Sequence, residues 1–353
     1  MEEFKILAIN PGSTSTKIAI YKNEKMIMEE NIIHLDEINR SLEEEFIFRK
    51  NLIDNFLKEK NFSIKEISAI SARGGLLKPI SGGVYKINKI MLDDLWNEKY
   101  GKHPCNLGAI LAESIGEKYN IPRFIVDPVV VDEMTEVAKL TGLKEIKRKS
   151  IFHCLNQRAV AKEYSKLKNK KYESLNLIVA HLGGGISVGL HKKGKIVDVN
   201  NALNGDGPFS PERSGGLPVE GILNLIFEKK YSKEKIMKKI KGEGGIYNYL
   251  GTKNLKEIIE QIEEIKEYKL IIDGMIYQIV KEIGSLYGVA NGDIDGVIFT
   301  GGISYSEYII KELKEKLKFI KNIEIFPGEM EMKALVFNIL DVLRNEVEIK
   351  EYK

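Results

Sequence analysis

Two short segments of this chain resemble each other, and their spacing constrains the fold more than any other feature. Residues 6–17 read ILAINPGSTSTK, and residues 177–188 read LIVAHLGGGISV. The second segment begins 171 positions after the first, which is close to half of the 353-residue length. In each segment an apolar run typical of a buried strand meets a loop of small residues, and a second strand leaves that loop. The spacing predicts two duplicated halves.

Both loops are suited to binding phosphate groups. A tight strand–loop–strand turn built from small residues can direct backbone N–H groups and hydroxyls to an anion without obstruction by side chains. The aligned positions are small or polar: Asn10 with His181, Gly12 with Gly183, and Thr16 with Ser187. Two such loops predict that each half offers a phosphate site to a cleft between the halves.

The overall composition excludes several classes of partner. The net charge is only +3, so no basic surface argues for nucleic acid. No apolar run approaches the roughly 20 residues of a membrane span, and the N-terminus enters a strand without a signal peptide. Cys105 and Cys154 lack metal-ligand spacing and are too few for a disulfide framework. We therefore expect a soluble, cytoplasmic protein with no nucleic-acid or membrane partner.

Hydrophobic periodicity predicts strands and helices in a similar order in the two halves. Strands are predicted over residues 4–10, 16–22, 25–33, 66–72, 123–127, 175–181, 186–192, 195–200, 296–300 and 322–326. Helices are predicted over about 41–60, 88–99, 104–119, 131–141, 153–167 and 330–345, and helices dominate from the end of the loop at 201–218 to about 291. This pattern indicates an α/β fold with mixed sheets flanked by helices.

The predicted domains follow from the duplication. The first spans residues 1–145 and is completed by a C-terminal helix at about 333–353, and the second spans 146–332. A parallel dinucleotide-binding fold is the competing architecture. No G-x-G-x-x-G follows a strand and opens a helix, and the chain has no G-x-x-x-x-G-K-[ST] loop. Phosphates must therefore be held by the hairpin loops.

Three segments carry a resemblance to known proteins. Residues 10–17, 181–187 and 299–303 (FTGGI) resemble the two phosphate loops and the adenosine loop of the superfamily of acetate and sugar kinases, actin and heat-shock chaperones. Within it, residues 6–17 resemble the first signature of the acetate kinase family. The resemblance implies two duplicated ribonuclease H-like domains with mixed sheets flanked by helices, and an active site in the interdomain cleft.

Further stretches make the resemblance to the acetate kinase family run almost end to end, and they narrow it to the branch that acts on butyrate. These stretches are residues 72–79 (ARGGLLKP), 126–132 (VDPVVVD), 150–153 (SIFH) and 207–215 (GPFSPERSG). The implied reaction is reversible transfer of the ATP γ-phosphoryl group to the butyrate carboxylate. Isobutyrate, propionate and acetate are the alternative acceptors. The implied cofactors are ATP or ADP and Mg²⁺, and a homo-oligomer is expected.

The chemistry of such a reaction explains why arginines are needed. A carboxylate is already deprotonated at pH 7, so no general base is required. The difficulty is to bring two anions together and to neutralise charge on the transferring phosphoryl group. Arginines, a metal ion and hydrogen-bond donors meet that need. Arg73 and Arg213, each in a loop with a glycine close by, are the candidate clamps.

The resemblance implies roles for further residues. His153 corresponds to a histidine that helps stabilise the transition state, and Asp127 to an essential aspartate near the metal and the arginines. His181 would donate to a phosphate oxygen. Asn10 and either Glu331 or Glu329 correspond to the metal-associated pair. The remaining residues implied in nucleotide binding are Ser13, Ser15, Thr16, Lys17, Gly183, Gly184, Gly185, Gly301, Gly302 and Ile303.

The acyl pocket is predicted near Gly74 and Gly75, with His103 and Phe152. Acetate kinases tend to carry bulky apolar residues just after the arginine that corresponds to Arg73. The lost side-chain volume predicts a larger pocket and a substrate longer than acetate. The alternative is that the glycines only relieve backbone strain. His34 and His191, on strands near loops, are interpreted as structural or surface residues.

Two other functions compete with a carboxylate kinase. A sugar or polyol kinase of the same fold would use Asp127 as a base to deprotonate a hydroxyl. The two arginines argue against it, because a neutral sugar gives them little to neutralise. A non-catalytic ATP-dependent switch would need a partner surface, and no segment marks one. Residues 251–256 (GTKNLK) are expected near the adenosine, but they carry lysine and asparagine where the family often shows aspartate and arginine.

Overall fold

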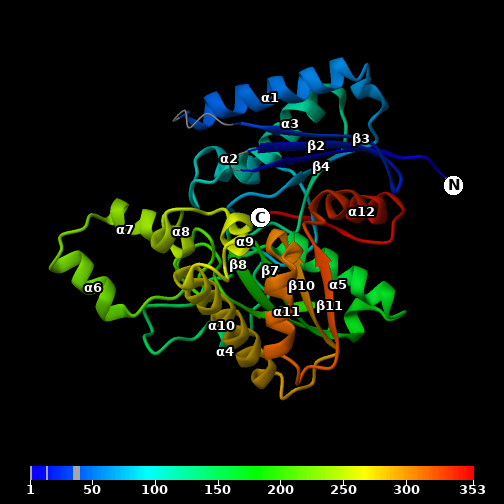
Figure 1. Ribbon diagram of the computed structural model, residues 1–353. Coiled ribbons are helices and arrows are strands. Elements are labelled where there is room, and N and C mark those ends of the chain that lie inside the picture. Colours follow the sequence, from blue (N-terminus) through cyan, green and yellow to red (C-terminus); the bar gives the residue numbers. More distant parts are fainter. Residues whose placement is uncertain (1, 13–14, 35–39) are drawn as a thin grey trace. The chain divides into compact units, whose positions relative to one another are not determined.

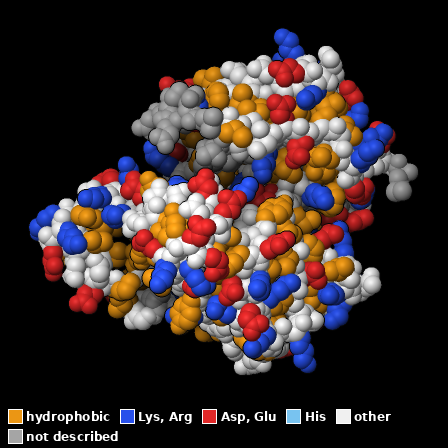
Figure 2. Space-filling model, in the orientation of Figure 1, with side chains coloured by type: hydrophobic (Ala, Val, Ile, Leu, Met, Phe, Trp, Pro, Cys, Tyr) orange, Lys and Arg blue, Asp and Glu red, His pale blue; other side chains and the backbone are white. Residues whose placement is uncertain are grey.

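The computed structural model describes residues 2–12, 15–34 and 40–353. The chain forms two compact units (Figure 1). Unit 1 comprises Met1–Val131 and Met330–Lys353, and unit 2 comprises Asp132–Glu329. Among the described residues, no helix combines the length and the apolar character that a membrane crossing requires. Figure 2 shows side chains of both charges interspersed over the surface in view, as the small net charge predicts.

Unit 1 is built on a seven-stranded mixed sheet with the order β12-β5-β6-β4-β1-β2-β3. Its strands are β1 (Lys5–Pro11), β2 (Ser15–Lys22), β3 (Lys25–Ile33), β4 (Ala69–Arg73), β5 (Val84–Lys86), β6 (Arg123–Val126) and β12 (Ile349–Glu351). The central strand β1 pairs antiparallel with β2 and parallel with β4, and β4 pairs parallel with β6. The carboxyl ends of β1, β4 and β6 therefore lie at one edge of this sheet.

Helices cover both faces of this sheet (Figure 1). They are α1 (Leu42–Glu59), α2 (Lys89–Trp96), α3 (Leu107–Gly116) and α12 (Glu331–Leu343). Leu7 and Ile9 of β1 belong to the apolar core that α1 and α3 complete. On the opposite face, the Ser71 hydroxyl of β4 donates to the Leu335 carbonyl of α12 at 2.7 Å. Because side chains alternate along a strand, β1 and β4 present residues to both layers.

Unit 2 holds a five-stranded sheet with the order β11-β10-β7-β8-β9. Its strands are β7 (Asn176–Leu182), β8 (Ile186–Lys192), β9 (Lys195–Val199), β10 (Gly296–Gly301) and β11 (Ile323–Pro327). Its helices are α4 (Glu136–Lys139), α5 (Cys154–Leu167), α6 (Val219–Phe227), α7 (Lys233–Ile240), α8 (Gly245–Leu250), α9 (Leu255–Glu260), α10 (Lys266–Val289) and α11 (Glu307–Lys316). Ile178 and Ala180 pack into a core with α10, whereas the alternate β7 residue His181 contacts α5.

The two sheets share one arrangement, which confirms the predicted duplication of the α/β fold. The order β6-β4-β1-β2-β3 in unit 1 matches β11-β10-β7-β8-β9 in unit 2, with the same parallel and antiparallel pairings. One detail of the sequence alignment is wrong. His181 pairs with Ser187, but Asn10 pairs with Lys17 rather than Thr16. The loop of unit 1 is one residue longer, so Lys17 takes the register position of Ser187.

The chain passes from unit 1 to unit 2 earlier than the sequence suggested. The predicted boundary lies at residue 145, whereas the division falls after Val131. The segment that follows is tied to β9: the Thr135 N–H donates to the Val197 carbonyl at 3.0 Å, and Arg148 forms an ion pair with Asp198 at 2.8 Å. The helix predicted over 131–141 is shorter for the same reason, since only Glu136–Lys139 is helical. The short strands β5 and β12 were not predicted.

Candidate active site

Three side chains of unit 1 meet at the carboxyl ends of β1 and β4. The register pairs Ile9 with Ala72, so the next residues, Asn10 and Arg73, lie at the same level of adjacent parallel strands. The Asn10 Nδ2 donates to Glu331 Oε2 at 2.7 Å, and Arg73 Nη1 donates to the same oxygen at 3.0 Å. Arg73 Nη1 also approaches Asn10 Oδ1 at 3.3 Å. The sequence left Glu331 and Glu329 open, and it is Glu331 that contacts Asn10.

Glu331 lies at a helix N-terminus and beside a cation. It is the first residue of α12, where the helix N-terminus stabilises an anion, and it forms a charge-assisted pair with Arg73. Only 3% of its surface is exposed. Among the described residues, no cluster of three or more His, Cys, Asp or Glu side chains could hold a metal ion. One carboxylate still fits Mg²⁺, which commonly takes one or two carboxylates and completes its shell with water and substrate phosphates.

Asp127 follows β6 directly, one residue beyond the level of Arg73 in the neighbouring strand. It is buried, and its φ of 38° places it in the left-handed region, which is uncommon for a residue other than glycine. Its Oδ1 accepts from the Gly83 N–H at 2.7 Å, and its own N–H donates to the Gly83 carbonyl at 3.1 Å. This reciprocal pair holds the strained turn, and such strain is concentrated at functional sites.

The two glycines after Arg73 are tightly packed. A Cβ on Gly74 would lie 2.5 Å from the Cβ of Pro128, and one on Gly75 would lie 2.6 Å from the Cα of Asn106. The Leu76 N–H donates to Asn106 Oδ1 at 2.8 Å, which fixes this contact. The inference that these glycines leave volume for a longer acyl chain is therefore wrong. They allow close approach of the backbone to Pro128 and Asn106. Neither glycine has a positive φ, so the alternative of relieved backbone strain is not supported either.

His103 precedes a short 3₁₀ helix, Pro104–Asn106, and its Nδ1 accepts from the Cys105 N–H at 3.2 Å. The same nitrogen lies 2.8 Å from the buried Cys105 Sγ. Its observed contacts are those of a capping residue. Whether it also borders the acyl group stays a prediction.

The first phosphate loop is described in part, and Ser13 lies outside the described residues. The Gly12 N–H donates to the Ser15 carbonyl at 2.8 Å. Thr16 is buried, and its hydroxyl accepts from Arg49 Nη1 at 2.9 Å and contacts His34 Nε2 at 3.0 Å. The Thr16 hydroxyl, which the sequence assigned to the nucleotide, is thus engaged by partners within unit 1.

In unit 2, the two predicted histidines lie against each other. The rings of His153 and His181 stack with centroids 3.8 Å apart and an interplanar angle of 9°. His153 occupies the N-cap position of α5, and His181 lies near the end of β7. Phe152, assigned to the acyl pocket, precedes His153 in the sequence and is buried. Two protonated imidazoles this close would repel each other, so the stack disfavours a charge on both rings at once.

A chain of hydrogen bonds defines the tautomer of His181. The Thr300 hydroxyl donates to the Gly328 carbonyl at 3.0 Å, so it must accept from Asn156 Nδ2, which lies 3.1 Å away. The same amide nitrogen lies 2.9 Å from His181 Nδ1 and donates to it. The neutral ring therefore carries its proton on Nε2. This nitrogen faces the second phosphate loop, since a Cβ on Gly183 would lie 3.0 Å from it.

Arg213 packs directly over the second phosphate loop. A Cβ on Gly185 would overlap its guanidinium, so this glycine is needed for the contact. Arg213 Nη1 donates to the Ala202 carbonyl at 2.6 Å, and the segment is tied to the loop by the Ser210 hydroxyl, which donates to the Gly184 carbonyl at 2.5 Å. Burial lowers the pKa of Arg213, but an arginine remains charged in proteins. Its Nε is buried without a hydrogen-bond partner among the described residues.

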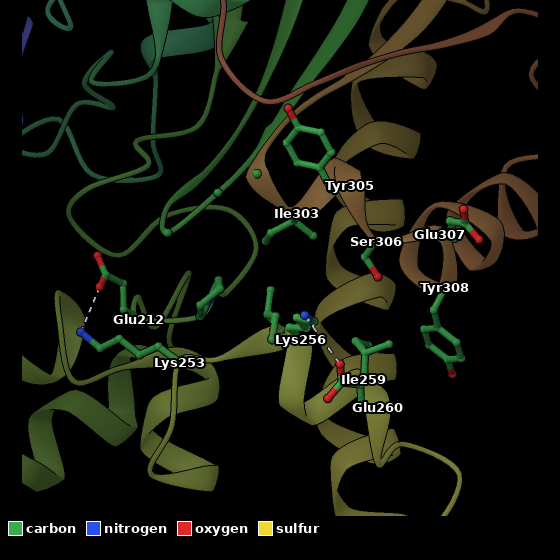
Figure 3. Close-up of a pocket in the computed structure, with 15 residues that line it drawn as sticks. Glu212, Lys253, Lys256, Ile259, Glu260, Ile303, Tyr305, Ser306, Glu307 and Tyr308 are labelled. Atoms are coloured by element: carbon green, nitrogen blue, oxygen red, sulfur yellow. Dashed lines mark hydrogen bonds and ion pairs between the residues drawn. The ribbon is translucent and has the colours of Figure 1, made fainter. Parts of the chain in front are cut away.

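A cavity of about 690 Å³ opens beside this loop within unit 2 (Figure 3). Gly183 and Gly184 border it, and so do Gly302 and Ile303, which begin a 3₁₀ turn after β10. Its further lining includes Glu212, Lys253, Leu255, Lys256, Ile259, Tyr305, Ser306 and Tyr308. Lys253 Nζ forms an ion pair with Glu212 Oε2 at 3.0 Å. The volume and the largely apolar lining suit a small-molecule ligand.

Sequence reasoning brought some of these residues to light and missed others. Gly183, Gly184, Gly302 and Ile303 were assigned to the nucleotide, and they line one cavity. Tyr305, Tyr308 and Ile259 were missed, because isolated aromatic and aliphatic residues on helices carry no signal of a pocket. Asn156 was missed as well, although its position three residues after His153 on a predicted helix could have drawn attention to it.

Comparisons with known proteins place these features in context. The profile of the acetokinase family matches residues 116–330. The chain is 50% identical over 353 residues to a probable butyrate kinase of Clostridium botulinum (strain Alaska E43 / Type E3), covering 99% of each. It is also 50% identical over 355 residues to butyrate kinase 2 of Clostridium acetobutylicum, covering 99% of this chain and 100% of that protein. The crystal structure of Porphyromonas gingivalis acetate kinase matches with a TM-score of 0.78 at 18% identity, covering 96% of this chain and 100% of that one, which shows a common fold.

Proposed function

This chain belongs to the acetokinase family, and we propose that it is a butyrate kinase, which transfers the γ-phosphoryl group of ATP reversibly to the carboxylate of butyrate. The observation that carries the proposal is the identity of 50% along 99% of the chain with proteins named as butyrate kinases. The buried arginine over a glycine-rich phosphate loop and the adjacent cavity are the features that this reaction requires.

The reaction needs charge neutralisation rather than proton transfer. A carboxylate oxygen of butyrate attacks the γ-phosphorus, and the bond from that phosphorus to the bridging oxygen of ADP breaks. We assign the stabilisation of the transferring group to Arg73 and Arg213, and to His153 and His181 as hydrogen-bond donors. The buried Arg213 Nε without a partner supports this assignment, because a phosphoryl oxygen would satisfy it.

The nucleotide is assigned to unit 2 and the metal to unit 1. The cavity bordered by Gly183, Gly184, Gly302 and Ile303 would take the adenosine, with phosphates along the glycine loop. Asn10 and Glu331 would hold a divalent ion, Mg²⁺ in our proposal, and this ion would neutralise charge on the phosphates when bound. Asp127, whose strained turn borders Arg73 in the sheet, belongs to the same group.

The test is ATP-dependent formation of acyl hydroxamate from a series of acids. Acetate, propionate, butyrate and isobutyrate are compared with a panel of sugars assayed for ADP release. We expect the highest kcat/KM for butyrate and no sugar-dependent ADP release. ADP release with a sugar but with none of the acids would overturn the proposal. A higher kcat/KM for isobutyrate or propionate would retain a carboxylate kinase and reassign its substrate.

A further inference from the structure

A continuous chain of buried hydrogen bonds runs behind His153 in unit 2. His153 Nδ1 lies 3.0 Å from Ser187 Oγ, and Gln157 Nε2 lies 2.8 Å from the same oxygen. At its other end, Gln157 Oε1 lies 3.1 Å from His191 Nε2, and His191 Nδ1 lies 2.8 Å from the Tyr172 hydroxyl. Ser187, Gln157 and His191 are each 0% exposed. The sequence had left His191 as a structural or surface residue.

The direction of each bond follows from one fixed contact. Gln157 Nε2 also lies 3.1 Å from the Ser187 carbonyl, which can only accept, so the amide nitrogen must face Ser187. The amide oxygen therefore faces His191, whose Nε2 must donate to it. Burial and the charge of Arg158 lower the pKa of His191 to about 3, so the ring is neutral and its Nδ1 accepts from the Tyr172 hydroxyl.

In this series of hydrogen bonds, only the direction of the Ser187 hydroxyl proton remains to be assigned. Its oxygen has two partners among the described residues, Gln157 Nε2 and His153 Nδ1. Since Gln157 can only donate there, a hydroxyl that also accepted from His153 would bury its own proton without a partner, which is unfavourable. The hydroxyl therefore donates to His153 Nδ1. The neutral His153 ring then carries its proton on Nε2.

We propose that Gln157 and His191 are positioning residues that hold His153 in the tautomer with its proton on Nε2. Asn156 does the same for His181, so two consecutive residues of α5 orient the protons of both stacked rings. Both histidines are thereby kept as neutral hydrogen-bond donors for the transferring phosphoryl group. This last step rests on the proposed function, whereas the assignment of the tautomer does not.

A glycine in strand β8 makes room for the amide of Gln157. A Cβ on Gly189 of β8 would overlap Gln157 Oε1. The amide thus lies against bare backbone, where it reaches Ser187 and His191 at once. A polar network that is fully paired in the interior specifies one arrangement, because any rotation of the amide would break several bonds together. The orientation and tautomer of the His153 ring therefore depend on residues that do not themselves reach the substrate.

The first experiment reads the tautomer directly. The protein labelled with ¹⁵N-histidine is studied by long-range ¹H–¹⁵N NMR, and the His153 signals are assigned by their loss in His153→Gln. We expect the pattern of a neutral ring with its proton on Nε2. In Gln157→Met the Ser187 hydroxyl no longer receives a bond from Gln157, so we expect His153 to become a mixture of tautomers. A proton on Nδ1 in the unaltered protein, or an unchanged pattern in Gln157→Met, would overturn the inference.

The second experiment connects the tautomer with turnover. Gln157→Met should lower kcat about tenfold with little change in KM for ATP or butyrate, by analogy with the loss of hydrogen-bond partners that orient metal-binding histidines. Tyr172→Phe, at the far end of the chain, should shift the His153 signals. Its matched control is Tyr164→Phe, which removes a buried tyrosine hydroxyl bonded to the Asp295 carbonyl outside the chain. Equal effects of both tyrosine variants on His153 would contradict the inference.

The two experiments also separate the inference from the proposed function. The NMR pattern is measured without substrate, so it stands or falls independently of the reaction. A tautomer that shifts in Gln157→Met while kcat remains unchanged would support the positioning of His153 and remove this histidine from the proposed mechanism.

Discussion

The two units carry the same sheet, but the ends of their matching strands differ in chemistry. In unit 1, Asn10 and Arg73 lie at the ends of β1 and β4 and meet a carboxylate from α12. In unit 2 the corresponding register positions of β7 and β10 hold His181 and Thr300, which are joined through a neutral amide. The strand ends of unit 1 carry a charged group, whereas those of unit 2 carry a hydrogen-bond network without an ion pair. The duplicated backbone supplies a frame, and the side chains on it decide the function of each half.

The comparison extends to the two arginines, and it gives the largest expected effects. Arg73→Ala and Arg213→Ala should each reduce kcat about 10³-fold or more. In related phosphoryl transfers, an arginine placed beside the transferring group contributes that much. Their effects on folding should differ. Arg73→Ala leaves the buried Glu331 without its cation and lowers stability. Arg213→Ala removes a buried cation and one bond to a backbone carbonyl, so it should lower stability less.

Hydroxamate assays and thermal unfolding measure the two effects. Arg344→Ala is the control, because this arginine of unit 1 pairs with the exposed Glu24 and lies outside the proposed site. Near-normal turnover in either variant would remove that arginine from the mechanism. Equal losses of melting temperature in both would end the contrast between an arginine that pairs with a buried carboxylate and one that bonds to a backbone carbonyl.

The neutral network of unit 2 should also make stability depend on pH. The His191 pKa is about 3 in the folded protein and near 6.5 in an unfolded chain. Between these values the unfolded state binds more protons, so stability is lost as pH falls below about 6.5, by about 1.4 kcal/mol per pH unit from this group. Comparing urea unfolding at pH 7 and pH 5 in the unaltered protein and in His191→Gln isolates the contribution. A variant with an unchanged pH dependence would show that His191 is not buried as a neutral ring.

The sequence predicted more of the candidate site in unit 1 than in unit 2, and the reason is physical. Asn10 and Arg73 could be anticipated, because family motifs mark both residues. The third member of the group was left open between Glu331 and Glu329, and the structure shows that Glu331 contacts Asn10. The duplication of the fold followed from the repeated strand–loop–strand pattern, whereas the order of the strands in each sheet was not predicted. The network behind His153 could not be found in this way. Its members come from α5, β8 and the turn before β7, and only the pairing of those elements brings them together.

The glycines after Arg73 show a second limit of sequence reasoning. The absence of a side chain was interpreted as free volume, but volume depends on what packs against the backbone, and Asn106 and Pro128 occupy it. Gly75→Val should therefore destabilise unit 1 by about 1–3 kcal/mol through overpacking, rather than alter acyl selectivity in a stable protein. Gly142→Val, where a Cβ would meet nothing within 4 Å, is the control in unit 2. A Gly75→Val enzyme of normal melting temperature that favours acetate would restore the original argument.

The smallest expected effect concerns the acyl chain itself. Butyrate has two more methylenes than acetate, and each contributes about 0.8 kcal/mol when it is fully removed from water. An imperfect pocket recovers somewhat less, so kcat/KM for butyrate should exceed that for acetate by about tenfold. Because Gly74 and Gly75 are packed against Pro128 and Asn106, this preference must come from other residues of the pocket. The acid series measured with the unaltered enzyme supplies the ratio. Equal efficiencies for acetate and butyrate would mean that no pocket encloses the extra methylenes, and the chain would then be a general short-chain carboxylate kinase whose specificity rests on the carboxylate alone.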